Sequence, residues 1–134
     1  MPGLPATKMN DQIVATDVHV LLIPAAAGAP VPTPTPMPFA GQLTMNLSPN
    51  VLIEKRPAAT VGSVAMNTPP HIPAGGPFQV GVPTNQGQVS RGSATVFING
   101  KPAARAGDDA ITCTELPWPT PPKVVATSTV LIGG

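Results

Sequence analysis

The residues of this chain with the clearest capacity for chemistry are its two histidines and its single cysteine. His19 and His71 each lie 14 residues after the proline of a Pro-Ala dipeptide, and Cys113 lies 11 residues after the proline of a third. Imidazole and thiolate side chains together form the ligand set of zinc sites, and iron also accepts them. If the three dipeptides begin equivalent units, folding brings the three side chains together. We therefore predict a metal site of His19, His71 and Cys113, with zinc as the first choice of metal and iron as the second.

The fourth ligand of such a site stays open at the level of the sequence. A water molecule would serve, as would a carboxylate from Asp17, Asp108 or Glu115. Simpler interpretations also compete with the metal site. A lone histidine beside proline is usually a loop or surface residue, and a lone cysteine usually fills a core. No Cys-x-x-Cys pair or similar local zinc pattern is present.

Catalysis is the competing use of these side chains. A catalytic zinc with an open position, or a nucleophilic pair of Cys113 with one histidine, would both need a substrate pocket and a group that orients the reacting residue. The segments around the candidate ligands are rich in alanine, glycine and proline, which give little material for such a pocket. We therefore expect no catalytic residues and no enzyme activity, and we keep a small metal-dependent hydrolase as the less favoured alternative.

Three short apolar segments recur along the chain and predict three equivalent strands. They are residues 48–53, 93–98 and 127–132, and their middle valine recurs at positions 51, 96 and 130. Each is a small or hydroxyl residue followed by three apolar residues and a turn, which is typical of a buried strand.

A second repeated element follows the strand. Residues 57–63 and 102–108 both begin Pro-Ala-Ala and lie 45 positions apart, and residues 5–11 keep the proline and the small residue. The first copy has no strand before it, and the last strand has no copy after it. Joining the two ends of the chain completes a third unit, so the sequence predicts circular, threefold pseudo-symmetry.

Composition limits the kind of fold and the kinds of partner. With 134 residues, 20 prolines, 13 glycines and a net charge of +1, the chain favours one small domain of short strands and turns over helices. It has no basic cluster, so we expect no nucleic-acid partner. Its most apolar run, residues 18–31, is broken by prolines and is too short to cross a bilayer. The single cysteine excludes an internal disulfide, and no secretory signal peptide is evident.

Each unit continues into a proline-rich stretch, at residues 30–38, 69–83 and 117–122. Alternating prolines favour extended polyproline-II backbone. They would serve as linkers or as ligands of a proline-recognition domain, or as the extended walls of a small cone. We prefer the walls, because each stretch has one large residue (Phe39, Phe78 or Trp118) that would anchor it inside. The expected fold is therefore a mainly β, conical domain with pseudo-threefold symmetry and extended proline-rich loops.

The stretch SATVFINGKPAARAGDDAITC, residues 93–113, resembles the PAAR-repeat proteins, which form the conical tips of contractile injection systems. Its centre, Pro102–Arg105, spells the tetrapeptide that gives the family its name. The resemblance covers nearly the whole chain and implies a single PAAR-like domain over residues 1–134, with no fused effector domain. In the family, a structural metal near the tip is bound by three histidines and one cysteine, whereas this chain has no third histidine.

The resemblance also implies a mechanical function. The partner would be a trimeric β-helical spike of the valine–glycine-repeat (VgrG-like) type, in a type VI secretion system or a phage-tail-like particle. The tip would sharpen the spike, carry the metal-stapled ligands at its apex and meet the target membrane first. Its base would be formed by the three predicted strands, namely Val51, Leu52, Ile53, Val96, Phe97, Ile98, Val130, Leu131 and Ile132.

The same resemblance suggests a cellular route and a second candidate role. The protein would be made in the bacterial cytoplasm without a signal peptide and delivered at the tip of the particle, outside the cell or into a target cell. An adaptor that binds an effector at the tip of the spike is the alternative. It would need a second partner and an exposed apolar patch away from the base.

Overall fold

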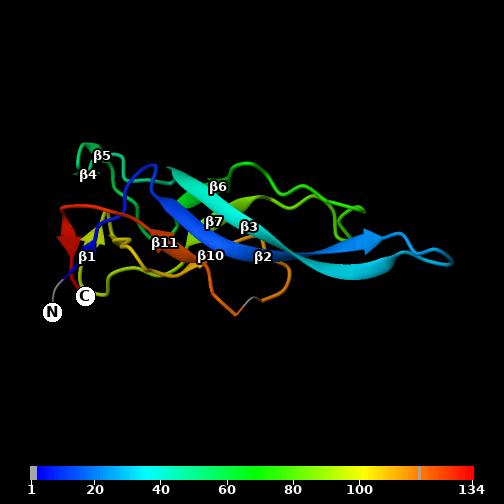
Figure 1. Ribbon diagram of the computed structural model, residues 1–134. Coiled ribbons are helices and arrows are strands. Elements are labelled where there is room, and N and C mark those ends of the chain that lie inside the picture. The colour runs from blue at the N-terminus through cyan, green and yellow to red at the C-terminus, as the bar shows by residue number, and fades with distance from the viewer. Residues whose placement is uncertain (1–2, 118) are drawn as a thin grey trace.

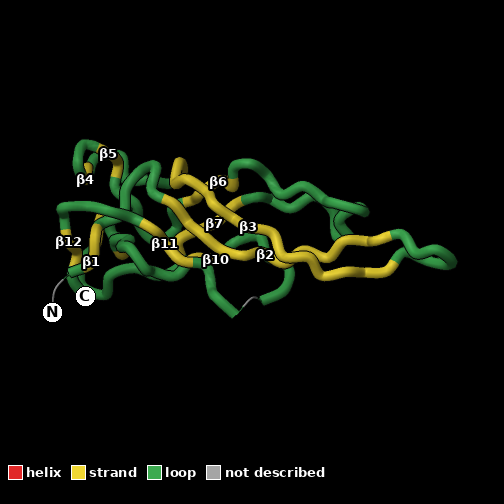
Figure 2. The backbone as a smooth tube through the Cα atoms, in the orientation of Figure 1, coloured by secondary structure: helices red, strands yellow, loops and turns green. Residues whose placement is uncertain are grey.

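The computed structural model describes residues 3–117 and 119–134, and the described chain is all β (Figures 1 and 2). The mainly β fold with pseudo-threefold symmetry is therefore confirmed. Two long strands and several very short ones form two regions, a base of three hairpin-like pairs and a barrel-like sheet above it. No helix long and apolar enough to cross a membrane occurs in these residues.

The base contains three equivalent two-stranded sheets. Each pairs one predicted apolar strand with the strand that begins a Pro-Ala segment. The pairs are β4 (Leu52–Ile53) with β5 (Arg56–Pro57), β8 (Phe97–Ile98) with β9 (Lys101–Pro102), and β12 (Leu131–Ile132) with β1 (Leu4–Pro5). The third pair joins the two ends of the chain, as the circular repeat predicted. In all three pairs the residue before the isoleucine lies opposite the proline.

A closed ring of backbone hydrogen bonds holds the three units together. The amide of Thr7 donates to the carbonyl of Ala104 (3.1 Å), that of Ala104 to Ala59 (3.0 Å), and that of Ala59 back to Thr7 (2.9 Å). These residues are fully buried, and two of the three are alanine. Small side chains are needed here because three backbones converge on one axis. This packing explains why the Pro-Ala-Ala segments recur.

Above the ring, each unit contributes two strands to one six-stranded sheet. The strands are β2 (Gln12–Ile23), β3 (Val31–Met45), β6 (Val64–Asn67), β7 (Gln86–Val89), β10 (Ala110–Ile111) and β11 (Lys123–Val125). The order is β10-β7-β6-β3-β2-β11, all antiparallel. A bridge between Asp109 and Lys123 links the two outer strands, so the sheet is almost a closed barrel.

The turns follow the same threefold pattern. Each Pro-Ala segment leads into a residue with positive φ, which is Asn10, Gly62 or Gly107. Asparagine and glycine are the residues that adopt this conformation most easily. The β8–β9 turn uses Asn99 and Gly100, both with positive φ, as expected for a type I′ hairpin. The β4–β5 turn adopts the same conformation with Glu54–Lys55, where both residues carry a side chain.

The first proline-rich stretch differs from the expected polyproline-II wall. Residues 31–38 belong to β3, which pairs with β2 from Gln12↔Gln42 to Ile23↔Val31. The two strands extend well beyond the barrel, and we call their outer part, residues 20–38, the finger (Figure 2). The finger points away from the end that holds the base and both chain termini (Figure 1). The two remaining proline-rich stretches are mainly loops.

Two clusters of buried side chains form the core. The base cluster contains Ile53, Ile98 and Ile132 together with the alanine of each Pro-Ala segment. The barrel cluster contains Phe39 with aliphatic residues from β2, β3, β7 and β11. Of the aromatic anchors predicted for the walls, Phe39 lies in this core. Phe78 is half-buried against His19, and Trp118 lies outside the described residues.

Candidate metal centre

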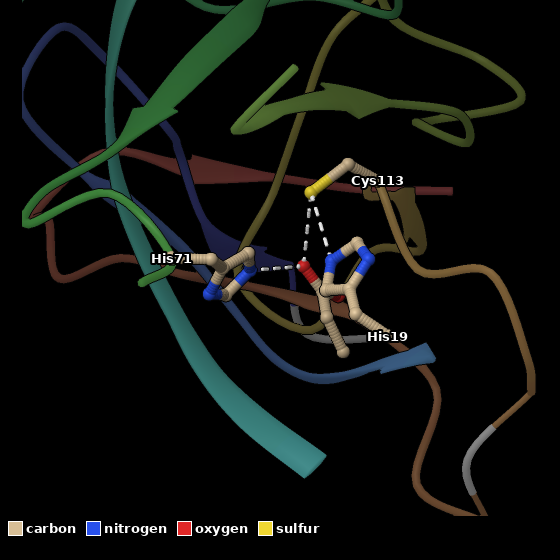
Figure 3. Close-up of side chains that lie close together, drawn as sticks. His19, His71 and Cys113 are labelled. Carbon is tan, nitrogen blue, oxygen red and sulfur yellow. Dashed lines mark hydrogen bonds and ion pairs between the residues drawn. The ribbon is translucent and has the colours of Figure 1, made fainter. Parts of the chain in front are cut away.

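The three residues predicted as metal ligands come together at one place, with a carboxylate between them (Figure 3). Donor atoms of Asp17, His19, His71 and Cys113 all lie within 4.8 Å of one another. Cys113 Sγ is 3.7 Å from His19 Nε2 and 3.3 Å from Asp17 Oδ2. His71 Nε2 is 2.8 Å from the same carboxylate oxygen. This cluster of two histidines, one cysteine and one aspartate could hold a metal ion.

Each of the three pseudo-symmetric units contributes to the cluster. Asp17 and His19 lie on β2 of the first unit, His71 on the loop after β6 of the second, and Cys113 just after β10 of the third. Asp17 and His19 share one face of β2 because side chains alternate along a strand. The loop that carries His71 continues along the outer edge of β2, where the amide of Leu22 donates to the carbonyl of Pro77 (2.9 Å).

A glycine allows this loop to approach β2 closely. A Cβ atom at Gly76 would lie 1.9 Å from the backbone oxygen of Leu22. Two residues later, Phe78 packs edge-on against the ring of His19, with ring centroids 5.6 Å apart. The loop therefore brings His71 to the cluster and covers one side of His19.

His19 is held in one orientation by a second carboxylate. Its Nδ1 lies 2.7 Å from Glu115 Oε2, and the same oxygen accepts a hydrogen bond from the amide of Val20 (3.3 Å). Nε2 of His19 therefore points at the cluster and Nδ1 points away from it. A carboxylate behind a histidine is the usual support of a metal ligand, because it fixes the ring and raises the basicity of the other nitrogen.

Asp17 is the centre of the hydrogen bonds in the cluster. Its side chain is fully buried, with 0 % of its surface exposed. The hydroxyl of Thr112 donates to Oδ1, and the thiol of Cys113 and the Nε2 of His71 meet Oδ2. A buried carboxylate requires such partners, because removing a charge from water is costly.

His71 is positioned by two asparagines. The backbone amide of His71 donates to Asn85 Oδ1 (2.8 Å), and its Nδ1 lies 3.4 Å from Asn67 Nδ2. Asn67 Oδ1 in turn accepts from the amide of Ala40 on β3 (2.9 Å). The loop after β6 is thus tied to both neighbouring strands before it reaches the cluster.

Cys113 is the most accessible member of the cluster. It is half-buried and lines a cavity of about 260 Å³, together with His19, Glu115 and residues 80–84. Burial raises the pKa of the Cys113 thiol to about 11, and its hydrogen bond to Asp17 adds to this effect. The thiol therefore carries its proton in the metal-free protein, and binding a metal requires that proton to leave.

The donor types are ones that zinc and iron both accept, and part of their spacing suits a tetrahedral site. In a tetrahedral site with bonds of about 2.0–2.3 Å, neighbouring ligand atoms are separated by about 3.3–3.8 Å. The distances from Cys113 Sγ to Asp17 and to His19 fall in this range. His71 Nε2 and Asp17 Oδ2 are closer, at 2.8 Å, which is a hydrogen-bond distance. The sequence left Asp17, Asp108 and Glu115 open as the fourth ligand, and the structure places Asp17 in the cluster. Glu115 instead supports His19, and Asp108 pairs with Arg105 in the base (2.9 Å).

A pattern in the sequence could have selected Asp17. It lies two residues before His19, and on an extended strand that spacing places both side chains on one face. The position of the cluster differs from the expected apex. Beyond His19, β2 continues to Ile23 and β3 begins at Val31, so the finger extends past the cluster. The cluster joins the barrel to the finger.

The described residues of the predicted base fall into three exposure classes. The isoleucines of the three strands are buried in the base cluster. Leu52, Phe97 and Leu131 point outward, with 58 %, 57 % and 57 % of their surface exposed. The three valines that precede them are half-buried or, at Val130, exposed. Pseudo-symmetry therefore extends to the exposure of single side chains.

The family comparison agrees with this geometry. The family model described as the PAAR motif matches residues 80–134, which include β8, β9 and Cys113. Residues 80–134 therefore contain a PAAR motif. The predicted resemblance to this family is therefore confirmed, and the family is structural rather than enzymatic. No curated protein matches the chain.

Proposed function

We propose that this protein is a PAAR-repeat protein and that it caps the blunt end of a trimeric β-helical spike in a contractile injection system. The observation that supports this function best is the base. Its three hairpins present Leu52, Phe97 and Leu131 outward to an almost equal degree. Three identical spike chains would meet three equivalent positions of one capping chain, which is how a single chain closes a threefold surface.

The chemistry of the base suits the end of a β-helix. Such an end leaves unpaired strand edges and apolar core residues exposed, and both are sticky unless they are covered. The outward residues of the three predicted apolar strands, Leu52, Phe97 and Leu131, are large and apolar. The base lies at one end of the molecule, opposite the finger (Figure 1). Capping would bury apolar surface on both partners, and that burial would drive the association.

The cluster would act in this protein as a structural metal site. Asp17, His19, His71 and Cys113 would hold a zinc ion, which supplies four strong bonds between segments far apart in sequence. The barrel core relies largely on alanine and valine, and it has one large aromatic residue. The barrel therefore buries little apolar surface. A bound metal ion that joins the three units would compensate for the stability that this small core does not supply.

The end opposite the base is suited to meeting a membrane. Residues 18–53 and 57–90 contain no lysine, arginine, aspartate or glutamate, and they include the whole finger and the loop beside it. Each charged side chain costs about 2.5–3.5 kcal/mol at the centre of a bilayer. A leading end without charges avoids that cost when contraction drives the tip forward.

Binding to a trimeric β-helical spike protein from the same organism tests the capping function. We expect Leu52→Glu, Phe97→Glu and Leu131→Glu each to weaken binding at least tenfold, because each places a charge in an apolar interface, an effect on the order of 1.4 kcal/mol or more. Isothermal titration calorimetry gives the affinities, and thermal unfolding shows that each variant is folded.

Val82→Glu is the matched control. Val82 is more exposed than any of the three base residues and lies beside the metal cluster, away from the base. Its variant should bind the spike with unchanged affinity. Equal losses at Val82 and at the base, or full binding by all three base variants, would exclude this interface.

A further inference from the structure

The finger leaves one strand edge without a partner. In the barrel, β3 pairs with β6 only from Gly41 to Met45. Along residues 31–38, no described segment pairs with the edge of β3 that faces away from β2. An open edge of this length is normally a site where another strand adds, and it leads to dimers or aggregates.

The backbone groups on this edge belong to the even-numbered residues. Alternate residues of an antiparallel strand direct their N–H and C=O groups to opposite sides. Ala40 directs both of its groups away from β2: its amide donates to Asn67 (2.9 Å), and its carbonyl accepts from Thr68 (3.4 Å). Residues 32, 34, 36 and 38 are in phase with Ala40 and face the same side.

All four of these residues are prolines, and their side chains are exposed. Proline has no N–H, so this part of the edge carries carbonyl groups and no donor. The residues between them, Thr33, Thr35 and Met37, face β2 and keep their amides for pairing within the finger. The proline alternation and the strand pleat therefore share the same period of two.

The opposite edge of the finger is closed by a different means. The residues of β2 that lie opposite the prolines direct their amides outward. Val18 donates to the hydroxyl of Thr114 (2.8 Å), Val20 to the carboxylate of Glu115 (3.3 Å), and Leu22 to the carbonyl of Pro77 (2.9 Å). The outward amides of Val18, Val20 and Leu22 are thus bonded, and on the opposite edge proline replaces the donor at positions 32, 34, 36 and 38.

We propose that Pro32, Pro34 and Pro36 form an edge block that prevents strand addition to the finger. The block keeps the finger a single two-stranded ribbon, although the ribbon is long, uncharged and open on one side. The carbonyl groups that remain cannot build a ladder alone, because an added antiparallel strand needs donors and acceptors on both sides. This role goes beyond capping and does not depend on a spike or a metal.

The test is the variant in which Pro32, Pro34 and Pro36 are all replaced by threonine. Threonine already alternates with these prolines at positions 33 and 35 and favours strands, so the finger should stay folded. The substitutions restore three donors to the edge. We expect sedimentation equilibrium to give the mass of one chain for the native protein and a concentration-dependent rise to two chains or more for the variant.

The matched control replaces Pro70, Pro73 and Pro121 by threonine. These prolines are equally exposed but lie in loops rather than on a strand edge. The control should stay a monomer, and near-ultraviolet circular dichroism should show both variants folded. Two results would overturn the proposal. One is a triple variant of the finger that stays monomeric at the highest soluble concentration, and the other is self-association of the native protein or of the control.

Discussion

Replacing Asp17 by asparagine should reveal how the cluster is stabilised. The carboxylate is fully buried and meets three side chains, those of His71, Thr112 and Cys113. Asparagine has nearly the same shape, so the change removes charge and one acceptor and leaves little empty volume. The amide would also direct donors at groups that are themselves donors.

The expected cost follows from these contacts. Hydrogen bonds to a charged group contribute about 1.5–3 kcal/mol each, and leaving a buried polar group without its partner costs about 1–3 kcal/mol. Because one oxygen acceptor remains in asparagine, we expect the metal-free protein to lose about 3 kcal/mol of unfolding free energy. For a chain of this size, that corresponds to a fall in melting temperature of roughly 10 °C.

The assay is thermal unfolding with a chelator and with zinc, combined with a count of bound zinc per chain. The native protein should bind one zinc and gain stability from it, whereas Asp17→Asn should lose stability in the chelator and most of its gain from zinc. Asp109→Asn is the control, because Asp109 is partly exposed and its ion pair with Lys123 should contribute less than about 1 kcal/mol. An Asp17→Asn variant that is as stable as the native protein in chelator, and that still gains full stability from one zinc, would refute this account.

Three further predictions concern the turns, the central ring and pH. Replacing Glu54–Lys55 by Asn-Gly, the pair used at residues 99–100, should raise the melting temperature by a few degrees, because Asn and Gly adopt positive φ more easily than Glu and Lys. An unchanged or lower melting temperature would contradict this. Thr7→Val should stabilise the protein by about 1 kcal/mol in urea unfolding, because the buried Thr7 hydroxyl has no partner among the described residues; destabilisation would show that the hydroxyl is satisfied. Zinc affinity should rise roughly tenfold per pH unit from pH 7 to 9, because the Cys113 thiol, with its pKa raised to about 11, must release its proton on binding. Calorimetry in buffers of different ionisation enthalpy counts that proton. A zinc affinity that does not change with pH would exclude the thiolate as a ligand.

The sequence predicts the base well because local chemistry specifies it. An apolar triplet, a turn and a Pro-Ala segment define each hairpin, and their spacing predicted even the pair β1–β12 between the chain ends. It also predicted which side chains meet, since His19, His71 and Cys113 occupy similar places in the repeat.

The finger and the fourth member of the cluster were harder to predict. Alternating prolines satisfy the polyproline-II geometry as well as they satisfy a strand edge, and pairing with β2 decides between the two. The β2–β3 pairing extends far beyond its counterpart β6–β7 in the second unit, so the repeat did not predict the finger. No strand was predicted around His19, so the sequence left Asp17, Asp108 and Glu115 open as the fourth ligand. The strand β2 decides between them by placing Asp17 and His19 on one face.

The pairing of β1 with β12 has a consequence for how the chain folds. The two strands are separated by almost the whole sequence, whereas the other two base hairpins close across two residues. Closing a long loop adds only a modest entropic cost, about 0.6 kcal/mol per doubling of its length, but contacts between distant residues slow folding. The first two hairpins can form while the ribosome is still synthesising the rest of the protein. The three-sided end is completed only when residues 131–132 have emerged and reach Leu4, so this pair forms after the other two.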